Sequence, residues 1–246
     1  MSALDAERFS FGDARGVRFG ALPEAVAKAL PRWIEGRDHA GLKAIKAGRV
    51  YRTDAWLLKF SGPRRGLRDA FRPSPAVRVA RTAARITAIR TPRPLLALEW
   101  RRGAFVEESL YVGEFVAGRR LHDLWGKDEA AVRAFPRFMA AMHGAYIVHG
   151  DFHPMNVVWN GAEWVLIDLD SIRGPLHVFR LRGIAMQQWA RTLRNLRFDA
   201  GVRALLEEYL RIAGVKWPAD DAWREIERRA HAMPPIDWSR VDEAAP

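Results

Sequence analysis

The sequence predicts an α+β protein with two lobes, a small antiparallel sheet with one helix followed by a mostly helical lobe. Residues 42–116 contain short apolar runs separated by turn residues, and one stretch with helical spacing. After Gly118 the apolar residues recur at helical spacing, apart from a single hairpin pattern. The chain has 246 residues, 49% of them apolar, which is enough to bury a large core.

Three regions are expected along the chain. Residues 1–40 are expected to be an N-terminal extension that packs on the first lobe, with a weakly amphipathic helix around Ala25–Ile34. Residues 41–116 are expected to form the first lobe. Its expected elements are strands within 42–51, 54–60, 95–100 and 109–116, turns at Gly48 and Asp54, and a helix over 76–89.

Residues 117–246 are expected to form the second, mostly helical lobe. Apolar residues on one face predict a helix over Glu129–Met142, which Pro136 is expected to kink or restart. Asn160-Gly161 between two apolar runs predicts a hairpin of 157–159 with 164–167. From Gly183 onward the spacing is helical.

Positive charge is concentrated in two blocks. The chain carries 40 Lys and Arg against 29 Asp and Glu, a formal charge of +11. Residues 64–93 hold nine Arg and one acid, and residues 171–198 hold six Arg and no acid. A uniform compositional bias towards Arg does not produce this split. The blocks indicate either an anionic partner or well-solvated faces.

Several classes of protein are not expected. No apolar run approaches the roughly 20 residues of a membrane-spanning helix. The first eight residues lack a basic segment followed by an apolar one, so no secretory signal is expected. The absence of cysteine excludes disulfides and thiolate chemistry and fits a reducing, cytoplasmic compartment.

The residues with the strongest chemical signal lie between 149 and 170. His149-Gly-Asp151-Phe-His153-Pro-Met-Asn156 precedes the predicted hairpin, and Asp168 follows it. Because the hairpin returns the chain, Asn156 and Asp168 can meet, and their oxygen atoms suit a hard cation such as Mg²⁺. Asp151 stays in the loop, where it can orient a hydroxyl nucleophile. Upstream, Lys59 follows an apolar run in a predicted strand, so its ammonium can pair with phosphate oxygens.

This arrangement resembles the protein-kinase-like two-lobed fold. His149, Asp151 and Asn156 match the kinase catalytic loop H-R-D-x-x-x-x-N, and Asp168 matches the metal-binding acid of D-F-G. Lys59 matches the lysine of the third kinase strand. The segments Lys46–Arg52, Ile89–Pro94 and Met142-His143 are further similar to the lipopolysaccharide kinase family, whose members phosphorylate Kdo or heptose of the inner core.

The resemblance implies an ATP-dependent kinase that uses Mg²⁺. Asp151 would accept or orient the proton of the acceptor hydroxyl, and His153 would contact the transferring group. Asn156 and Asp168 would bind Mg²⁺. Lys59 and Gly48 would bind the phosphates of the nucleotide. The backbone of Glu114 and Val116 would bind its adenine. His149 and His143 are expected to be structural.

Two departures from the kinase pattern leave alternatives open. No carboxylate occurs between Asp69 and Glu99, where kinases place the helix glutamate that pairs with the strand lysine. The phosphate loop has one glycine, Gly48, in place of three. A pseudokinase that binds nucleotide or a partner without transfer is therefore an alternative, as is a small-molecule kinase similar to aminoglycoside phosphotransferases.

The expected partner is an anionic sugar or glycolipid. Arginines recognise its carboxylates or phosphates well, and Arg173, Arg180 and Arg182 are expected on the acceptor side. A glycolipid acceptor would place the protein at the cytoplasmic face of the inner membrane. Nucleic acid is not expected as a partner, because aromatic residues are not interleaved with the basic blocks.

Overall fold

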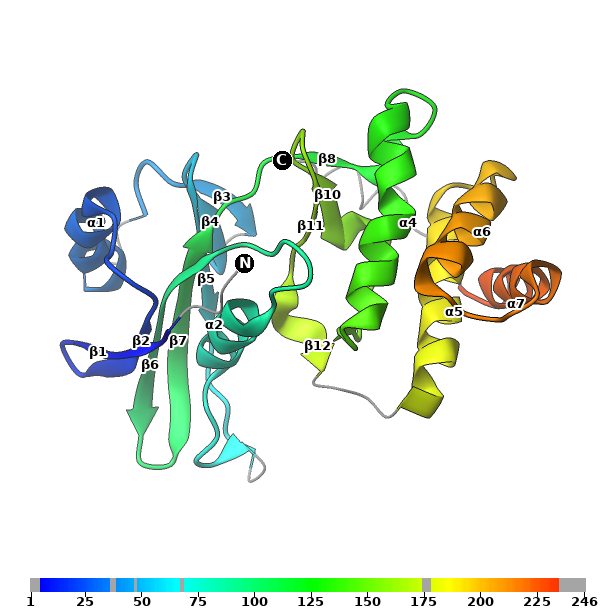
Figure 1. The fold of residues 1–246 in the computed structure, drawn as a ribbon. Helices are drawn as coiled ribbons and strands as arrows, with labels where there is room; N and C mark the ends of the chain where they lie inside the picture. The colour runs from blue at the N-terminus through cyan, green and yellow to red at the C-terminus, as the bar shows by residue number, and fades with distance from the viewer. Residues whose placement is uncertain (1–4, 36–38, 47, 67–68, 174–177, 235–246) are drawn as a thin grey trace. The chain divides into compact units, whose positions relative to one another are not determined.

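The computed structural model describes residues 5–35, 39–46, 48–66, 69–173 and 178–234, and the chain divides into two compact units (Figure 1). Unit 1 comprises the residues up to Thr87 together with Thr91–Val116. Unit 2 comprises Ala88–Arg90 and the residues from Ala117 to Ala245. Among the described residues, no helix is long and apolar enough to cross a membrane.

Unit 1 contains a seven-stranded sheet in the order β1-β2-β6-β7-β5-β4-β3, with every neighbouring pair antiparallel. The strands are β1 (Glu7–Phe11), β2 (Ala14–Arg18), β3 (Lys43–Lys46), β4 (Val50–Arg52), β5 (Trp56–Ser61), β6 (Pro94–Arg102) and β7 (Phe105–Glu114). The strands predicted within 42–116 are confirmed. The sequence analysis missed the β1–β2 hairpin, so residues 7–18 extend the sheet itself.

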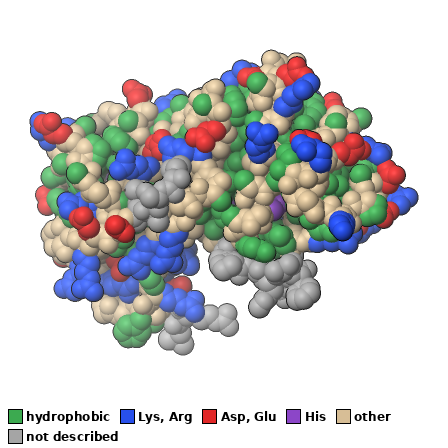
Figure 2. Space-filling view, viewed as in Figure 1, with side chains coloured by type: hydrophobic (Ala, Val, Ile, Leu, Met, Phe, Trp, Pro, Cys, Tyr) green, Lys and Arg blue, Asp and Glu red, His purple; other side chains and the backbone are tan. Residues whose placement is uncertain are grey.

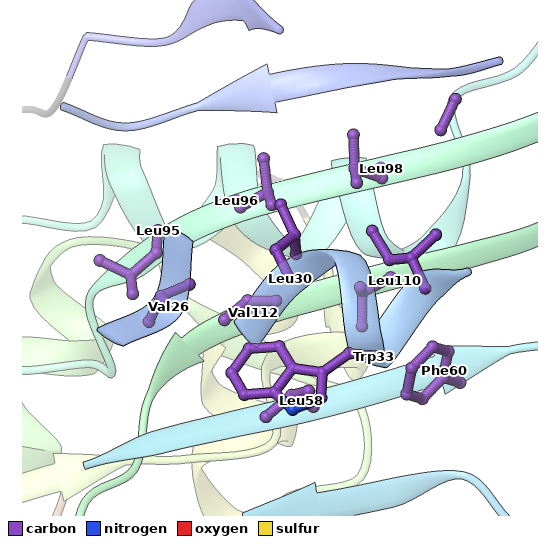
Figure 3. Packing of buried hydrophobic residues seen from close by; sticks show 12 residues of the cluster. Val26, Leu30, Trp33, Leu58, Phe60, Leu95, Leu96, Leu98, Leu110 and Val112 are labelled. Atoms are coloured by element: carbon purple, nitrogen blue, oxygen red, sulfur yellow. The ribbon is translucent and has the colours of Figure 1, made fainter. Parts of the chain in front are cut away.

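Helix α1 (Glu24–Ile34) packs on one face of this sheet, as the helical spacing near Ala25 predicts. Val26, Leu30 and Trp33 recur on one side of the helix and are buried against the strands (Figure 3). The strand residues in this cluster include Leu58, Phe60, Leu96, Leu98, Leu110 and Val112. The apolar area removed from water is what stabilises this layer.

Helix α2 (Pro75–Arg85) packs on the opposite face, over β6 and β7. It begins at Ser74, whose hydroxyl accepts a hydrogen bond from the Val77 N–H at 3.2 Å. The helix is shorter than predicted because Ile86 turns to extended backbone, with φ −76° and ψ 116°. Ala76, Ala80 and Ala83 lie on its buried side, and these small side chains allow close approach to the sheet.

Unit 2 begins with β8 (Arg119–Arg120), which pairs with the middle strand of a three-stranded sheet. Gly118 lies so close to the middle strand of this sheet that a Cβ atom at Gly118 would lie 2.5 Å from the Trp159 carbonyl oxygen. The remaining short elements are α3 (Leu121–Leu124), β9 (Val148–His149), η2 (Pro154–Asn156), β10 (Val157–Trp159), β11 (Trp164–Leu166), η3 (Leu169–Ser171) and β12 (Ile172–Arg173). The predicted hairpin is β10–β11.

Four longer helices lie among the described residues of unit 2, as the helical spacing predicts. They are α4 (Glu129–Gly144), α5 (Val178–Asn195), α6 (Gly201–Ala213) and α7 (Ala219–His231). Helix α4 runs unbroken past Pro136, which is buried, so the predicted restart does not occur. Helix α4 packs on α6, and α5 packs on α7.

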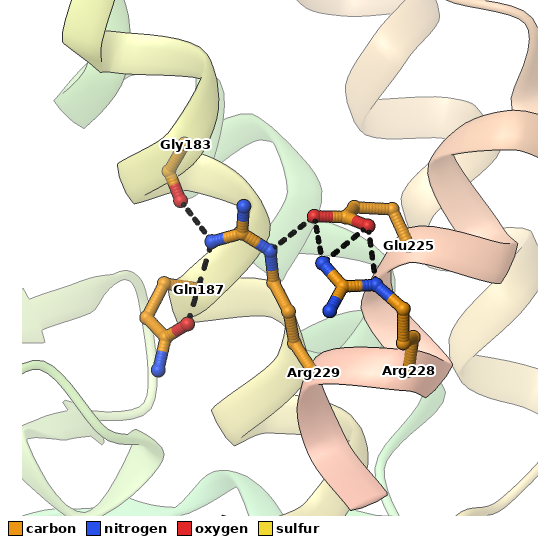
Figure 4. Close-up of polar contacts among 5 residues, drawn as sticks. All are labelled: Gly183, Gln187, Glu225, Arg228 and Arg229. Atoms are coloured by element: carbon orange, nitrogen blue, oxygen red, sulfur yellow. Dashed lines mark hydrogen bonds and ion pairs between the residues drawn. The ribbon is translucent and has the colours of Figure 1, made fainter. Parts of the chain in front are cut away.

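A charged contact joins α7 to α5 (Figure 4). The Arg229 guanidinium donates to the Gly183 carbonyl at 2.9 Å and to the Glu225 carboxylate at 2.6 Å. Arg228 also donates to Glu225, and the two guanidinium groups lower the pKa of this carboxyl. These residues are close to the surface, so the contact fixes helix orientation more than it adds stability.

Candidate active site

The predicted catalytic loop lies in unit 2 between β9 and β10. The Asn156 side-chain amide donates to the backbone carbonyl of Asp151 at 3.0 Å, which closes the loop on itself. The Asp151 carboxylate is 70% exposed, so it is open to an incoming substrate. Because the amide nitrogen of Asn156 is used by the loop, its amide oxygen is the atom that can face a metal ion.

The hairpin brings Asp168 back beside Asn156, as the sequence predicts. The Ile167 N–H donates to the Asn156 carbonyl at 2.8 Å. Asp168 therefore directly follows the last residue that is hydrogen-bonded across the hairpin. Asp168 adopts left-handed backbone geometry, with φ 54° and ψ 59°. This conformation is uncommon for a residue other than glycine and is frequent at functional sites.

His149 ties these two segments together. Its Nε2 donates to the carbonyl oxygen of Asp168 at 2.8 Å, and the ring is buried. The Gly150 N–H donates to the Ser171 carbonyl, and His149 pairs with Ile172 in the β9–β12 ladder. The prediction that His149 is structural is therefore confirmed, because its hydrogen bond fixes the backbone on which the Asp168 carboxylate is mounted.

A buried hydrogen-bonded chain continues behind His149. Gln188 donates to the His149 carbonyl at 3.4 Å and accepts from His143 Nε2 at 2.7 Å. His143 Nδ1 lies 2.9 Å from the Tyr209 hydroxyl. Burial lowers the pKa of His143 to about 4, so the ring is neutral at pH 7, with the Tyr209 hydroxyl as donor to Nδ1. His143 is structural, as predicted.

His153 lies half-buried beside Asp151. Its Nδ1 accepts a hydrogen bond from the Met155 N–H at 3.3 Å. Burial lowers the pKa of His153, the Asp151 charge partly offsets this, and nearby cations including Arg191 lower it further. Because Nδ1 is an acceptor, the ring hydrogen of the neutral imidazole is on Nε2, which is then the donor that a ligand can meet.

Arg191 is a residue of this site that no sequence pattern identifies. This α5 side chain donates to the Phe152 carbonyl at 2.6 Å and lies 3.7 Å from a carboxylate oxygen of Asp151. It therefore holds the predicted catalytic loop at Phe152 and places a positive charge next to Asp151. The sequence gives Arg191 only as one member of an acid-free basic block, with no spacing that links it to a loop forty residues earlier.

Unit 1 carries the predicted nucleotide residues. Lys59 lies in the middle of β5, opposite Val50 on β4 and Tyr111 on β7. Strand alternation puts its half-buried side chain on the sheet face that α2 covers, opposite the Leu58 side chain. Helix α2 has no carboxylate, so the helix glutamate of the kinase pattern is absent from it.

Gly48 lies in unit 1, as do Glu114 at the end of β7 and Val116 after it. Gly48 lies in the exposed turn between β3 and β4 with φ +71°, a conformation that favours glycine. The N–H groups of Glu114 and Phe115 donate to Arg93 and Ala55 carbonyls at 2.8 Å. Within the described residues, the Val116 N–H has no such acceptor, so it is free for a ligand.

The second basic block is only partly visible. The side chains of Arg173 and Arg180 lie outside the described part of the structure, as does Arg68 of the first block. Arg182 is exposed and its guanidinium lies 4.9 Å from the centre of the Trp217 ring. That Arg173, Arg180 and Arg182 face the acceptor stays a prediction.

The donor set of the loop suits Mg²⁺ better than a transition metal. Among the described residues, no group of three or more His, Cys, Asp or Glu side chains gathers as a metal site. Asn156 and Asp168 offer one amide oxygen and one carboxylate from adjacent backbone positions. Magnesium is commonly held by one or two carboxylates together with phosphate oxygens and water, and these residues fit that pattern.

The chain is similar in fold to a solved structure of another protein. The solved structure "WaaP in complex with acyl carrier protein" matches with a TM-score of 0.50 and 17% identity, over 86% of this chain and 98% of that one. The structure of the bifunctional kinase-methyltransferase WbdD matches at 0.38 and 13%, over 96% of this chain and 53% of that one. No curated protein matches the sequence significantly.

The WaaP match confirms the predicted kinase-like fold. A family model for the phosphotransferase enzyme family matches residues 14–174. This range includes Lys59 on β5 and the loop from Asp151 to Asp168. The chain belongs to the phosphotransferase enzyme family and is a kinase.

Proposed function

We propose that this kinase transfers the γ-phosphate of ATP to a sugar hydroxyl, with Kdo or heptose of the lipopolysaccharide inner core as the leading acceptor. The observation that carries the proposal is that the loop with Asp151 and the segment with Asp168 meet in unit 2. There, one hairpin and the His149 hydrogen bond hold Asn156 and Asp168 beside the loop that carries Asp151.

The proposal gives each conserved type of kinase contact to a residue of this chain. Lys59 and Gly48 bind the ATP phosphates, while the Glu114 and Val116 backbone binds the adenine. Asn156 and Asp168 hold Mg²⁺, which when bound neutralises the charge of the phosphate oxygens. Phosphoryl transfer needs mainly positioning and charge stabilisation, so few residues suffice.

Asp151 takes the role of orienting the acceptor hydroxyl and accepting its proton. Its exposure leaves room for a sugar, and the Arg191 guanidinium lies 3.7 Å from a carboxylate oxygen of Asp151. His153 then donates from Nε2 to the transferring phosphoryl group. It does so as a neutral imidazole at pH 7, because burial lowers its pKa.

An anionic sugar is favoured as acceptor over a cationic one. The sequence segments shared with lipopolysaccharide kinases support an inner-core sugar, and the WaaP fold is in agreement with it. Arg191 is in contact with the catalytic loop, and Arg182 is exposed in the same acid-free block. Such a block repels cationic aminoglycosides and attracts the carboxylate or phosphate groups of the inner core. With a glycolipid acceptor, the protein would work at the cytoplasmic face of the inner membrane.

An acceptor screen tests the proposal directly. Purified protein is incubated with ATP and Mg²⁺ and with Kdo, heptose, deacylated inner-core oligosaccharide or kanamycin, and products are identified by mass spectrometry. We expect a mass increase of one phosphate on an inner-core acceptor and none with Asp151→Asn. Transfer to kanamycin alone would contradict the acceptor assignment. Nucleotide binding without transfer to any acceptor would identify a pseudokinase.

A further inference from the structure

A second concave site lies in unit 1, at the β1–β2 end of the sheet. The cavity has a volume of about 470 Å³, within the size range of small-molecule sites. It is lined by residues of the β1–β2 hairpin, β6, α2 and the segment that leads into α2. Its charged lining residues are Arg8, Arg15, Arg81, Arg101 and Glu99.

The sheet register explains why these side chains converge. Arg15 on β2 lies directly opposite Ser10 on β1 and Glu99 on β6, so the three side chains share one face. Helix α2 packs on β6 and β7, and the hairpin extends the sheet beyond it. Arg81 on the exposed side of α2 lines the same cavity as Arg15.

The cavity is electropositive because most of its arginines lack an acidic partner. Arg101 is satisfied, with a hydrogen bond to Glu99 at 2.7 Å and others to backbone carbonyls. Within the described residues, the side chains of Arg8, Arg15 and Arg81 make no hydrogen bond or ion pair. Figure 2 shows Lys and Arg side chains gathered over the β1–β2 hairpin and α2. Like charges gathered around one concavity repel each other, and an anion would relieve this.

The cavity is separate from the residues assigned to ATP. Lys59 lies on β5, which β6 and β7 separate from β2, a distance of three strand spacings or roughly 14 Å. None of the residues that line the cavity is one that the kinase pattern assigns to ATP.

We propose that this cavity binds a small ligand with two or more phosphate groups. Three arginines without partners suit phosphate, because the guanidinium fork donates two parallel hydrogen bonds to it. Phe71, 85% exposed at the rim, offers an apolar surface next to the charges. The phosphates can come from a free sugar bisphosphate or from the headgroup of an anionic lipid, and Phe71 distinguishes these sources.

Calorimetric titration with fructose 1,6-bisphosphate tests the proposal, in the presence of a saturating non-hydrolysable ATP analogue. We expect Arg15→Gln and Arg81→Gln each to weaken binding by about tenfold or more. Arg85→Gln is the matched control, since Arg85 is exposed on the same helix and does not line the cavity. We expect it to change binding by less than about twofold, because the Arg85 side chain does not line the cavity.

A second arm uses phosphatidylcholine vesicles with and without phosphatidylglycerol. Co-sedimentation that requires phosphatidylglycerol and decreases with Arg15→Gln and with Phe71→Ser would assign the site to a lipid headgroup. Bisphosphate binding that Phe71→Ser leaves intact would assign it to a free ligand. If neither probe binds, or if Arg85→Gln acts like Arg81→Gln, the proposal is wrong. Binding of the ATP analogue, measured on the same samples, reports separately on the proposed kinase function.

Discussion

The candidate site residues of unit 2 are fixed by hydrogen bonds, whereas those of unit 1 are fixed by strand register and turns. In unit 2 a buried chain runs from Tyr209 through His143 and Gln188 to His149, which holds the Asp168 backbone. In unit 1 Lys59 is placed by its neighbours in the sheet, and Gly48 by an exposed turn.

Because of this difference, we expect substitutions in the two units to differ in their effects on catalysis and stability. Buried polar groups that satisfy one another specify a single geometry, and losing one partner leaves the other unpaired at a cost of about 1–3 kcal/mol. An exposed turn has no such network, so it tolerates change. We therefore expect substitutions around the unit 2 loop to alter both catalysis and stability, and substitutions in the unit 1 turn to have small effects.

The largest effect is expected for Asp168→Ala. This change removes the carboxylate that the proposal assigns to Mg²⁺, and the loss of one electrostatic contact to a reacting group costs about 10²–10³-fold in kcat. Steady-state kinetics at several Mg²⁺ concentrations measure it. Asp170→Asn is the comparison, because it changes an exposed acid two residues away. An equal loss for the two variants would contradict the assignment of the metal to Asp168.

The next effect is the pH dependence of stability that His143 confers. Its pKa is about 4 in the folded protein and near 6.5 when unfolded, so the unfolded chain binds the proton more tightly. The contribution of neutral His143 to the free energy of unfolding is therefore fully present above about pH 6.5 and is lost as the pH falls towards 4. This contribution amounts to roughly 3 kcal/mol. Urea unfolding from pH 7 to pH 4 measures it.

His143→Gln should flatten this pH dependence while lowering stability at pH 7, since the buried chain loses one member. His231→Gln is the control, because His231 is exposed at the end of α7. A wild-type profile that His143→Gln leaves unchanged would show that another group causes the acid sensitivity.

The same contrast explains what the sequence could predict. The unit 2 loop is contiguous in the chain, so Asp151, Asn156 and the Asp168 hairpin could be recognised from spacing alone. Most elements of unit 1 also followed from apolar patterns. The β1–β2 hairpin did not, because Glu7, Arg8, Arg15 and Arg18 interrupt the apolar pattern of its strands Glu7–Phe11 and Ala14–Arg18, and β2 is held in the sheet by pairing with β6.

Arg191 shows the other limit of sequence analysis. Its role depends on how α5 packs beneath the loop, a long-range contact that no local spacing encodes. Likewise α2 was predicted to be longer, because Ile86 and Ile89 continue the apolar spacing. Ile89 is indeed buried, although the helix has already ended at Arg85. Apolar spacing reports burial, and tertiary packing decides the backbone.

Arg191→Gln is expected to reduce kcat by about tenfold, because the Phe152 carbonyl and the Asp151 carboxylate both lose a charged neighbour. The KM for ATP should stay within about twofold, since the nucleotide residues assigned above lie elsewhere in the chain. Arg191→Lys should recover part of the activity. The pKa of His153, followed by NMR, should rise in Arg191→Gln, because Arg191 lowers it in the wild type. Lower stability with an unchanged kcat would show that Arg191 has a purely structural role.

The smallest effect is expected for Gly48→Ala, which tests the unit 1 side of the comparison. The φ of +71° disfavours any residue with a Cβ atom by about 1–2 kcal/mol, although no described atom lies within 4 Å of that position. The strain acts in an exposed turn, so we expect about 1 kcal/mol less stability and a rise of a few-fold in the KM for ATP. Gly103→Ala is the matched control, because Gly103 also has positive φ and open space, at the β6–β7 turn. Equal losses of stability with a raised KM only for Gly48→Ala would place the phosphates of ATP at the β3–β4 turn. A KM unchanged by Gly48→Ala would leave Lys59 as the phosphate contact of unit 1 and remove Gly48 from the site.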